Sequence, residues 1–139
     1  IFNIDTFRPG FKYQTNLLNY DGFLEVFEGQ GDNWSFVKTK NKNSTEVTET
    51  AEKNRISNLC CTGLYHFKSL TDYVESYLNF LEMPKEEWQK GELYVAPLYN
   101  YLIKNGKEIH FNLIKREEVI FCGVPAEYDS FLKSSFSNE

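Results

Sequence analysis

Glu52 and Lys53 are the adjacent residues of this sequence whose side chains are best suited to binding chemistry. A carboxylate accepts hydrogen bonds from hydroxyl groups, and an ammonium offers a compact positive charge and three N–H donors to a phosphate. The pair is followed by the apolar run Ser57–Phe67, which we expect to be a central strand of a sheet. An acid and a base held at the end of a rigid strand predict a site for a phosphorylated, polar small molecule.

The sequence also allows other roles for these charged residues. Adjacent acidic and basic residues also occur at exposed strand ends, and Arg55 strengthens an anion site only if its side chain points the same way. Asp5 follows Ile1–Ile4, an alternating run that we expect to be a strand. Because ligands of open α/β sheets bind outside the carboxyl ends of the strands, Asp5 is a candidate Mg²⁺ ligand. Capping of the following turn is the alternative role for Asp5.

Length and composition exclude several classes of protein. A chain of 139 residues is expected to form one domain over residues 1–139 with a real core. A net charge of -5 argues against non-specific nucleic-acid binding, which needs a basic face. No apolar run approaches the roughly 20 residues of a membrane span, so we expect no membrane partner. The three cysteines lack disulfide or metal-ligand spacing, which favours reduced thiols and a cytoplasmic location.

Strand-like and helix-like segments alternate along the chain. Ser69 is a good helix N-cap, and apolar residues recur at helical spacing from Leu70 to Leu81. Asn105-Gly106 is a typical helix stop, and residues after Ser134 are expected to fray. The other expected strands cover 23–27, 34–38, 46–50, 109–113 and 119–121, and the other helices 93–104 and 126–133. This order predicts an α/β fold in which flanking helices cover a sheet and residues 22–50 form an insertion rich in hairpins.

Several motifs in this order resemble those of the sugar-phosphate nucleotidyltransferases, the family that includes the glucose-1-phosphate thymidylyltransferases and capsule-related bacterial enzymes. They are I-F-N-I-D at the start, a W-S-F-V strand, E-K, S-N-x-x-x-T-G-L-Y-x-F, and G-V-P-A-E-Y near the end. The run S-N-x-x-x-T-G-L-Y-x-F after E-K is the most specific of these. The resemblance covers essentially the whole chain and corresponds to the C-terminal half of such an enzyme.

The resemblance implies a Rossmann-like mixed sheet and an Mg²⁺-dependent transfer of a nucleotide from an NTP to a phosphorylated sugar, with release of pyrophosphate. Asp5 matches the metal-binding aspartate of the family. Glu52 matches the residue that binds sugar hydroxyls, and Lys53 matches the catalytic residue that meets the acceptor phosphate. Thr62, Gly63 and Tyr65 fall where the strand of the family passes under the sugar. A homo-oligomer is a further expectation, because the aromatic residues around 88–101 could cover a partner.

Two departures from the family motifs limit this comparison. The glycine-rich loop that holds the NTP is absent, so we expect this chain to be inactive alone and to be the acceptor-binding portion of a longer enzyme. Phe121 stands where many relatives carry a second metal-binding aspartate. Both departures also fit a non-catalytic regulatory or assembly module of the same fold, and a small-molecule-binding domain that uses no metal is a third alternative. The sequence identifies neither the nucleotide nor the acceptor.

Overall fold

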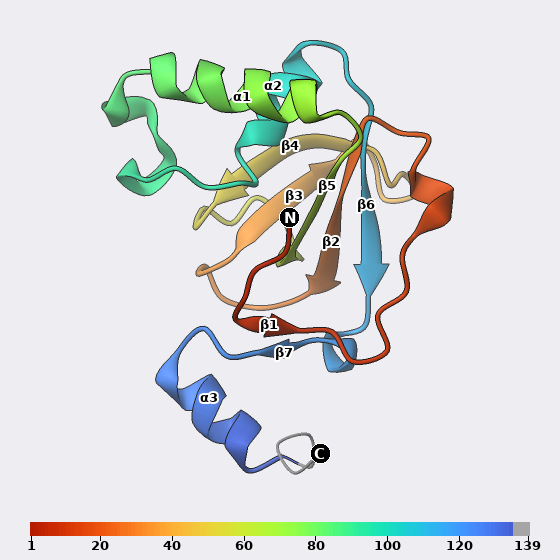
Figure 1. Cartoon of the computed structure of the whole chain (residues 1–139), viewed down its shortest axis with the longest axis vertical. Coiled ribbons are helices and arrows are strands. Elements are labelled where there is room, and N and C mark those ends of the chain that lie inside the picture. The colour runs from red at the N-terminus through yellow and green to blue at the C-terminus, as the bar shows by residue number, and fades with distance from the viewer. Residues whose placement is uncertain (135–139) are drawn as a thin grey trace.

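The computed structural model describes residues 1–134, and the expected fraying after Ser134 lies outside this range. Its main feature is a five-stranded sheet in the order β4-β3-β5-β2-β6. The strands are β2 (Gly22–Glu28), β3 (Ser35–Thr39), β4 (Val47–Glu52), β5 (Leu59–Phe67) and β6 (Ile109–Ile114). Strand β2 is parallel to β6 and antiparallel to β5, so the sheet is mixed, as expected (Figure 1).

A hairpin over residues 35–52 extends this sheet, and most of it falls in the range 22–50 where hairpins were expected. Strands β3 and β4 are antiparallel neighbours, and β3 joins β5 through the pair Phe36 and Cys60. In the chain this hairpin lies between β2 and β5, which pair directly with each other. The hairpin therefore adds an edge to the sheet and carries Glu52 to the end of its outer strand.

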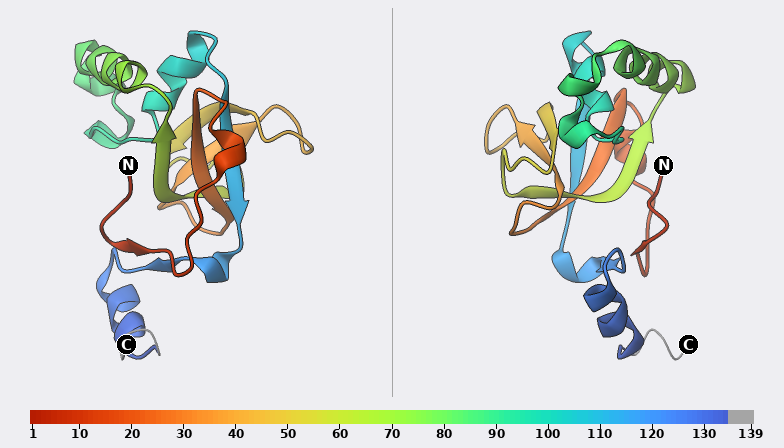
Figure 2. Two further views of the ribbon diagram at one scale, coloured as in Figure 1. Left: turned by 45° about the vertical axis from the view of Figure 1, so that its right-hand side comes forward. Right: turned by 90° about the vertical axis from the view of Figure 1, so that its left-hand side faces the viewer.

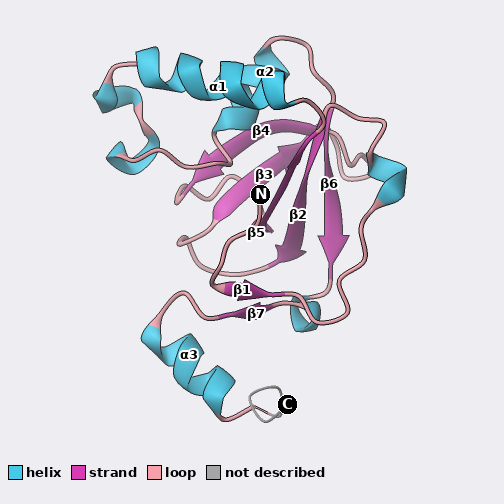
Figure 3. Cartoon of the chain, in the orientation of Figure 1, coloured by secondary structure: helices cyan, strands magenta, loops and turns pink. Residues whose placement is uncertain are grey.

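A second, two-stranded sheet lies at one end of the molecule. It pairs β1 (Thr6–Phe7) with β7 (Ile120–Phe121), and α3 (Pro125–Leu132) follows it. Helices α1 (Leu70–Glu82) and α2 (Leu98–Lys104) lie beside each other at the opposite end (Figures 1 and 3). Short 3₁₀ turns cover Thr15–Leu17, Lys85–Glu87, Gln89–Gly91 and Arg116–Glu118.

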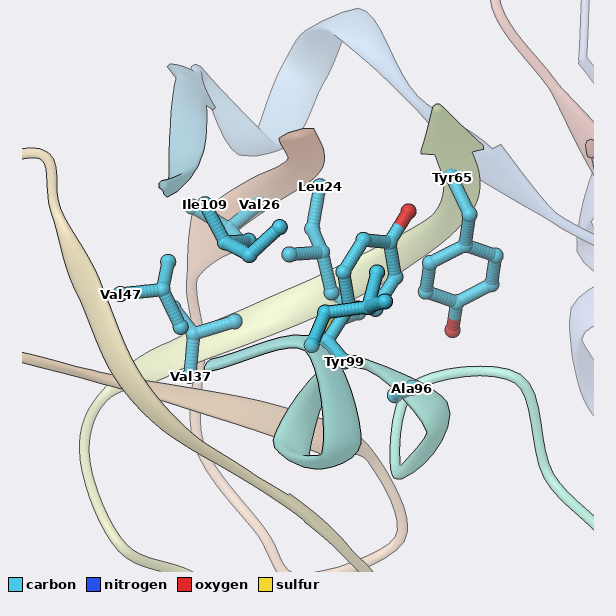
Figure 4. Close-up of a cluster of buried hydrophobic side chains, with 10 residues drawn as sticks. Leu24, Val26, Val37, Val47, Tyr65, Ala96, Tyr99 and Ile109 are labelled. Atoms are coloured by element: carbon cyan, nitrogen blue, oxygen red, sulfur yellow. The ribbon is translucent and has the colours of Figure 1, made fainter. Parts of the chain in front are cut away.

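Within residues 1–134, the larger of two hydrophobic clusters lies between the sheet and α2, and the smaller one includes Phe121 of β7. Leu24 and Val26 of β2, Ile109 of β6 and Leu102 of α2 are almost completely buried in the larger one. Tyr99 points from α2 into this cluster (Figure 4), and its hydroxyl donates a 2.8 Å hydrogen bond to the carbonyl oxygen of His66. Burial of such side chains stabilises the sheet that carries the charged pair at the end of β4.

The prediction that Ile1–Ile4 form a strand is mostly wrong. Only Phe2 forms a bridge, with Leu64 of β5, and backbone hydrogen bonds join Ile1 to Tyr65 and Asn3 to Gly63. The chain turns away from β5 after Asn3, which leaves Ile4 fully exposed. Asp5 therefore precedes the short strand β1 and does not end a longer one. Figure 2 shows this N-terminal segment beside β5.

The helices differ from expectation in two respects. The helix expected over 93–104 begins only at Leu98, because Pro97 forms its N-cap and residues before a proline avoid the helical conformation. The side chain of Ser69 caps α1 as expected, by accepting a hydrogen bond from the backbone of Asp72. The apolar stripe of α1 faces outward, however. Its buried residues are Asp72, Ser76 and Phe80, while Leu70, Val74, Leu78 and Leu81 are exposed.

Candidate functional site

One open cleft of about 690 Å³ brings the candidate residues together. Every residue that the sequence analysis proposed for the site lines it: Asp5, Glu52, Lys53, Thr62, Gly63 and Tyr65. Strands β4 and β5 contribute most of them, and the segment before β1 contributes Asp5. Apart from Asp32, which also lines the cleft, its charged groups fall into two clusters. We call residues Ser35, Glu52, Lys53 and Tyr94 the lysine wall, and Asp5, Gly123 and Glu127 the carboxylate wall.

Glu52 ends β4 and is held by bonds to two neighbouring segments. Its carboxylate accepts a hydrogen bond from the hydroxyl of Ser35, and its backbone N–H donates to the side chain of Gln89. The side chain is buried, and burial raises the pKa of Glu52, while the Ser35 hydrogen bond and the charge of Lys53 oppose the rise. A carboxylate has about four acceptor positions, so Glu52 retains capacity to accept hydroxyl groups of a ligand.

Lys53 is held in the left-handed backbone conformation, with a φ of 49°. Its N–H donates to the carbonyl oxygen of Trp34 at 2.9 Å, which fixes the turn that follows β4. The ammonium donates a 2.9 Å hydrogen bond to the hydroxyl of Tyr94, and this bond raises the pKa of Lys53. The lysine therefore presents a full positive charge to the cleft next to the carboxylate of Glu52.

Gly63 requires glycine for two reasons. Its φ of +97° lies in the region that L side chains rarely adopt, and a Cβ there would stand 2.6 Å from the side-chain nitrogen of Asn3. The N–H of Asn3 also donates to the carbonyl oxygen of Gly63 at 3.0 Å. Gly63 was expected in the site from the sequence, whereas Asn3 was not, although its side chain packs over the strand at this point.

Thr62 and Tyr65 are buried, like Glu52 and unlike Asp5. The hydroxyl of Thr62 donates to the carboxylate of Glu25 at 2.9 Å, and that carboxylate is paired with Arg8 at 2.7 Å. Both partners of this ion pair are almost completely buried. Tyr65 belongs to the hydrophobic core, and its burial raises the pKa of the phenol. Thr62 and Tyr65 thus anchor the floor of the cleft to the core.

The carboxylate wall places two acidic side chains close to Gly123. A Cβ at Gly123 would stand 2.9 Å from the Asp5 carboxylate and 3.8 Å from that of Glu127. Glu127 accepts hydrogen bonds from the backbone N–H groups of Gly123 and Val124 at 3.0 and 3.3 Å. Asp5 is exposed in the cleft. Because Mg²⁺ is commonly held by one or two carboxylates together with water and substrate phosphates, the exposed Asp5 fits the expected metal.

Two other residues, Arg55 and Phe121, have roles that the sequence did not predict. Arg55 does not line the cleft, and its guanidinium donates to the carbonyl oxygens of Gly29 and Gly31 and to the side chain of Asn58. It does not reinforce the anion site. Phe121, at the position of the second aspartate of relatives, is buried beside Trp34 with ring centroids 4.8 Å apart. The side chain of Phe121 therefore packs at the edge of the cleft and offers no metal ligand.

The arrangement can hold a small, polar, anionic molecule near a lysine and the exposed carboxylate of Asp5, within a mixed α/β fold. A solved structure with this fold is the nucleoside-diphosphate-sugar pyrophosphorylase from Vibrio cholerae RC9. It is 58% identical to this chain with a TM-score of 0.91, over 96% of this chain and 55% of that one. This likeness supports the nucleotidyltransferase family that the motifs indicated, and this chain spans about half the length of that relative. No protein-family model and no curated protein matches the chain.

Proposed function

We propose that this chain is the acceptor-binding portion of an Mg²⁺-dependent sugar-phosphate nucleotidyltransferase. The observation that carries the proposal is the meeting of Asp5, Glu52 and Lys53 in one cleft, in a chain 58% identical to a protein described as a nucleoside-diphosphate-sugar pyrophosphorylase. The reaction joins the nucleotidyl group of an NTP to a phosphorylated sugar or related acceptor and releases pyrophosphate. With a phosphorylated sugar the product is an NDP-activated sugar, whereas a CMP-activated sugar would form only from an acceptor without a phosphate.

The lysine wall binds the acceptor in this proposal. Lys53 meets the acceptor phosphate, because a phosphate oxygen can take the ammonium N–H groups that Tyr94 does not use. Glu52 accepts hydrogen bonds from sugar hydroxyls with the part of its carboxylate that Ser35 leaves available. The backbone at Gly63, free of a Cβ, allows the sugar to approach β5 closely. The acceptor oxygen is thereby held in place for attack, and positioning supplies much of the catalysis.

The carboxylate wall binds the metal in this proposal. Asp5 would hold Mg²⁺, which supplies neutralisation of the phosphate charges when it is bound. The carboxylate of Glu127 accepts two backbone hydrogen bonds at the start of α3, so Asp5 is the principal metal ligand in this proposal. Lys53, on the other wall, limits repulsion between the acceptor phosphate and the carboxylates of the site.

The biological setting follows from the same resemblance. We propose a bacterial enzyme of the cytoplasm that supplies activated sugars for capsule or surface polysaccharide, and that works as a homo-oligomer. Among the described residues, no helix is long and apolar enough to cross a membrane. The NTP would be bound by the glycine-rich loop that the family carries outside the region resembling this chain.

A non-catalytic regulatory or assembly module of the same fold is the second candidate. It is favoured by Phe121, whose aromatic ring stands where relatives carry a metal-binding aspartate. Such a module would keep a sugar-phosphate cleft and lack turnover. The two candidates differ in whether pyrophosphate is released.

The test is a screen of the protein at its native length for pyrophosphate release, with each NTP combined with a panel of sugar phosphates and Mg²⁺. The proposal expects release with one NTP and one acceptor class, and a sharp fall in turnover in Lys53→Ala. Binding of a sugar phosphate without release from any pair would favour the module. Wild-type turnover in Lys53→Ala would remove the role assigned to Lys53.

A further inference from the structure

Tyr94 connects two opposite charges at the mouth of the cleft. Its hydroxyl accepts the hydrogen bond of Lys53 at 2.9 Å and donates one to the carboxylate of Glu92 at 2.6 Å. The ammonium also lies 5.0 Å from the centroid of the Tyr94 ring. Glu92 is exposed and close enough to act electrostatically on both Lys53 and Glu52. A neutral phenol therefore stands between the lysine and an acid that would otherwise neutralise it.

The position of Tyr94 is fixed by hydrogen bonds between its segment and β4. The hydroxyl of Thr50 donates to the carbonyl oxygen of Ala96 at 2.7 Å, and the N–H of Thr50 donates to the side chain of Asn100 at 2.8 Å. Both Thr50 and Ala96 are buried. Since Lys53 follows the same strand, β4 sets the spacing between the lysine and the tyrosine.

The chemistry of these three groups gives the tyrosine a defined role. An ammonium has three N–H donors, and a hydrogen bond to a neutral oxygen occupies one of them without cancelling the charge. A direct ion pair with Glu92 would offset the positive charge that an anionic ligand needs. As long as the Tyr94 hydroxyl engages both partners, the acid is held at the far side of the phenol.

We propose that Tyr94 is a positioning residue of the anion site, which orients the ammonium of Lys53 and prevents Glu92 from pairing with it. The inference rests on the proposed function in one respect, that Lys53 meets the phosphate of the acceptor. It adds that the strength of phosphate binding depends on a phenol whose hydroxyl bonds to the lysine and to the competing acid.

The first test measures binding of α-glucose 1-phosphate and of inorganic phosphate by titration calorimetry, with the protein at its native length. Tyr94→Phe keeps the ring and removes the hydroxyl, so Kd is expected to rise about tenfold. Glu92→Gln in the Tyr94→Phe background is expected to restore most of the lost affinity, because the competing acid is gone. Tyr128→Phe, which removes the hydroxyl of an exposed tyrosine outside the cleft, is the matched control.

A second readout needs no ligand and separates this inference from the proposed function. NMR of the Lys53 side chain reports its pKa, which the Tyr94 hydrogen bond raises in the wild type. In Tyr94→Phe, Glu92 is expected to pair with Lys53 and to keep the pKa of the lysine raised. The pKa of Lys53 should then fall only in the double variant that also carries Glu92→Gln. A fall of the pKa in Tyr94→Phe alone, or an affinity loss that Glu92→Gln does not rescue, overturns the inference. Absence of sugar-phosphate binding in the wild type contradicts the proposed function, and the NMR pattern then still decides the role of Tyr94.

Discussion

The two walls of the cleft are built in different ways. The lysine wall stands on the five-stranded sheet, and each charged group on it is held by neighbours: Ser35 and Gln89 hold Glu52, and Trp34 and Tyr94 hold Lys53. The carboxylate wall stands beside a sheet of two short strands, each of two residues, and Asp5 is exposed. A group fixed before binding loses less entropy when a ligand arrives. The lysine wall is therefore suited to orient an acceptor, and the carboxylate wall to share a metal with substrate phosphates and water.

One buried ion pair joins the two regions. Arg8 follows β1, pairs with Glu25 of β2, and donates a 2.5 Å hydrogen bond from its guanidinium to the carbonyl oxygen of Glu118. Glu25 also accepts the hydroxyl of Thr62 on the floor of the cleft. Phe121 of β7 also packs against Phe27 of β2, so polar and apolar contacts together join the carboxylate wall to the main sheet.

The largest expected effect comes from breaking this connection. Glu25→Gln leaves the guanidinium of Arg8 buried without a counter-charge, which is expected to lower the free energy of unfolding by about 3–5 kcal/mol. Chemical denaturation measures the change. Lys38→Met removes an exposed pair with Glu49 and is the control, with an expected change of roughly 0–1 kcal/mol. Equal effects of the two substitutions would contradict the connecting role of Arg8 and Glu25.

A smaller effect is expected in the pH dependence of sugar-phosphate binding at the lysine wall. Burial raises the pKa of Glu52 above the ordinary glutamate value of 4.5. A raised pKa means that the carboxylate takes up a proton at a higher pH, so sugar-phosphate binding should weaken as the pH falls, beginning above 4.5. Titration calorimetry at a series of pH values checks this expectation.

Two variants sharpen the pH measurement. Ser35→Ala removes a hydrogen bond that lowers the pKa of Glu52, so the midpoint should move to higher pH. Glu52→Gln should abolish this part of the pH dependence. An unchanged midpoint in Ser35→Ala, or a pH profile in Glu52→Gln that matches the wild type, would show that another group titrates.

Sequence patterns were most informative where the physical signal is local. The helix cap at Ser69 and the stop at Asn105-Gly106 depend on residues within a few positions of each other, and both occur as predicted. The apolar run of β5 also indicated a central strand, and β5 lies between β3 and β2. The residues of the site could be predicted as a group from the sequence, because their motifs follow one another along the chain in the same order as in the family.

Patterns failed where the answer depends on distant segments. Ile1–Ile4 alternates like a strand, yet only Phe2 bridges to β5, and nothing in the local sequence reports where that pairing ends. Ser35 and Tyr94 were missed as partners of Glu52 and Lys53 because a hairpin and a long crossover bring them together. The outward apolar face of α1 could not be predicted either, since helical periodicity does not say which face the rest of the chain covers.

The measurement that tests the division of the cleft most directly is binding of α-glucose 1-phosphate without Mg²⁺, compared in the wild type, Lys53→Met and Asp5→Asn. The account predicts that Lys53→Met weakens binding by about tenfold to a hundredfold, because a charge-assisted contact to phosphate is lost. Asp5→Asn should bind the metal-free ligand as well as the wild type does, and should lose only the gain in affinity that Mg²⁺ brings. Wild-type affinity in Lys53→Met, or equal losses in both variants without metal, would contradict the account.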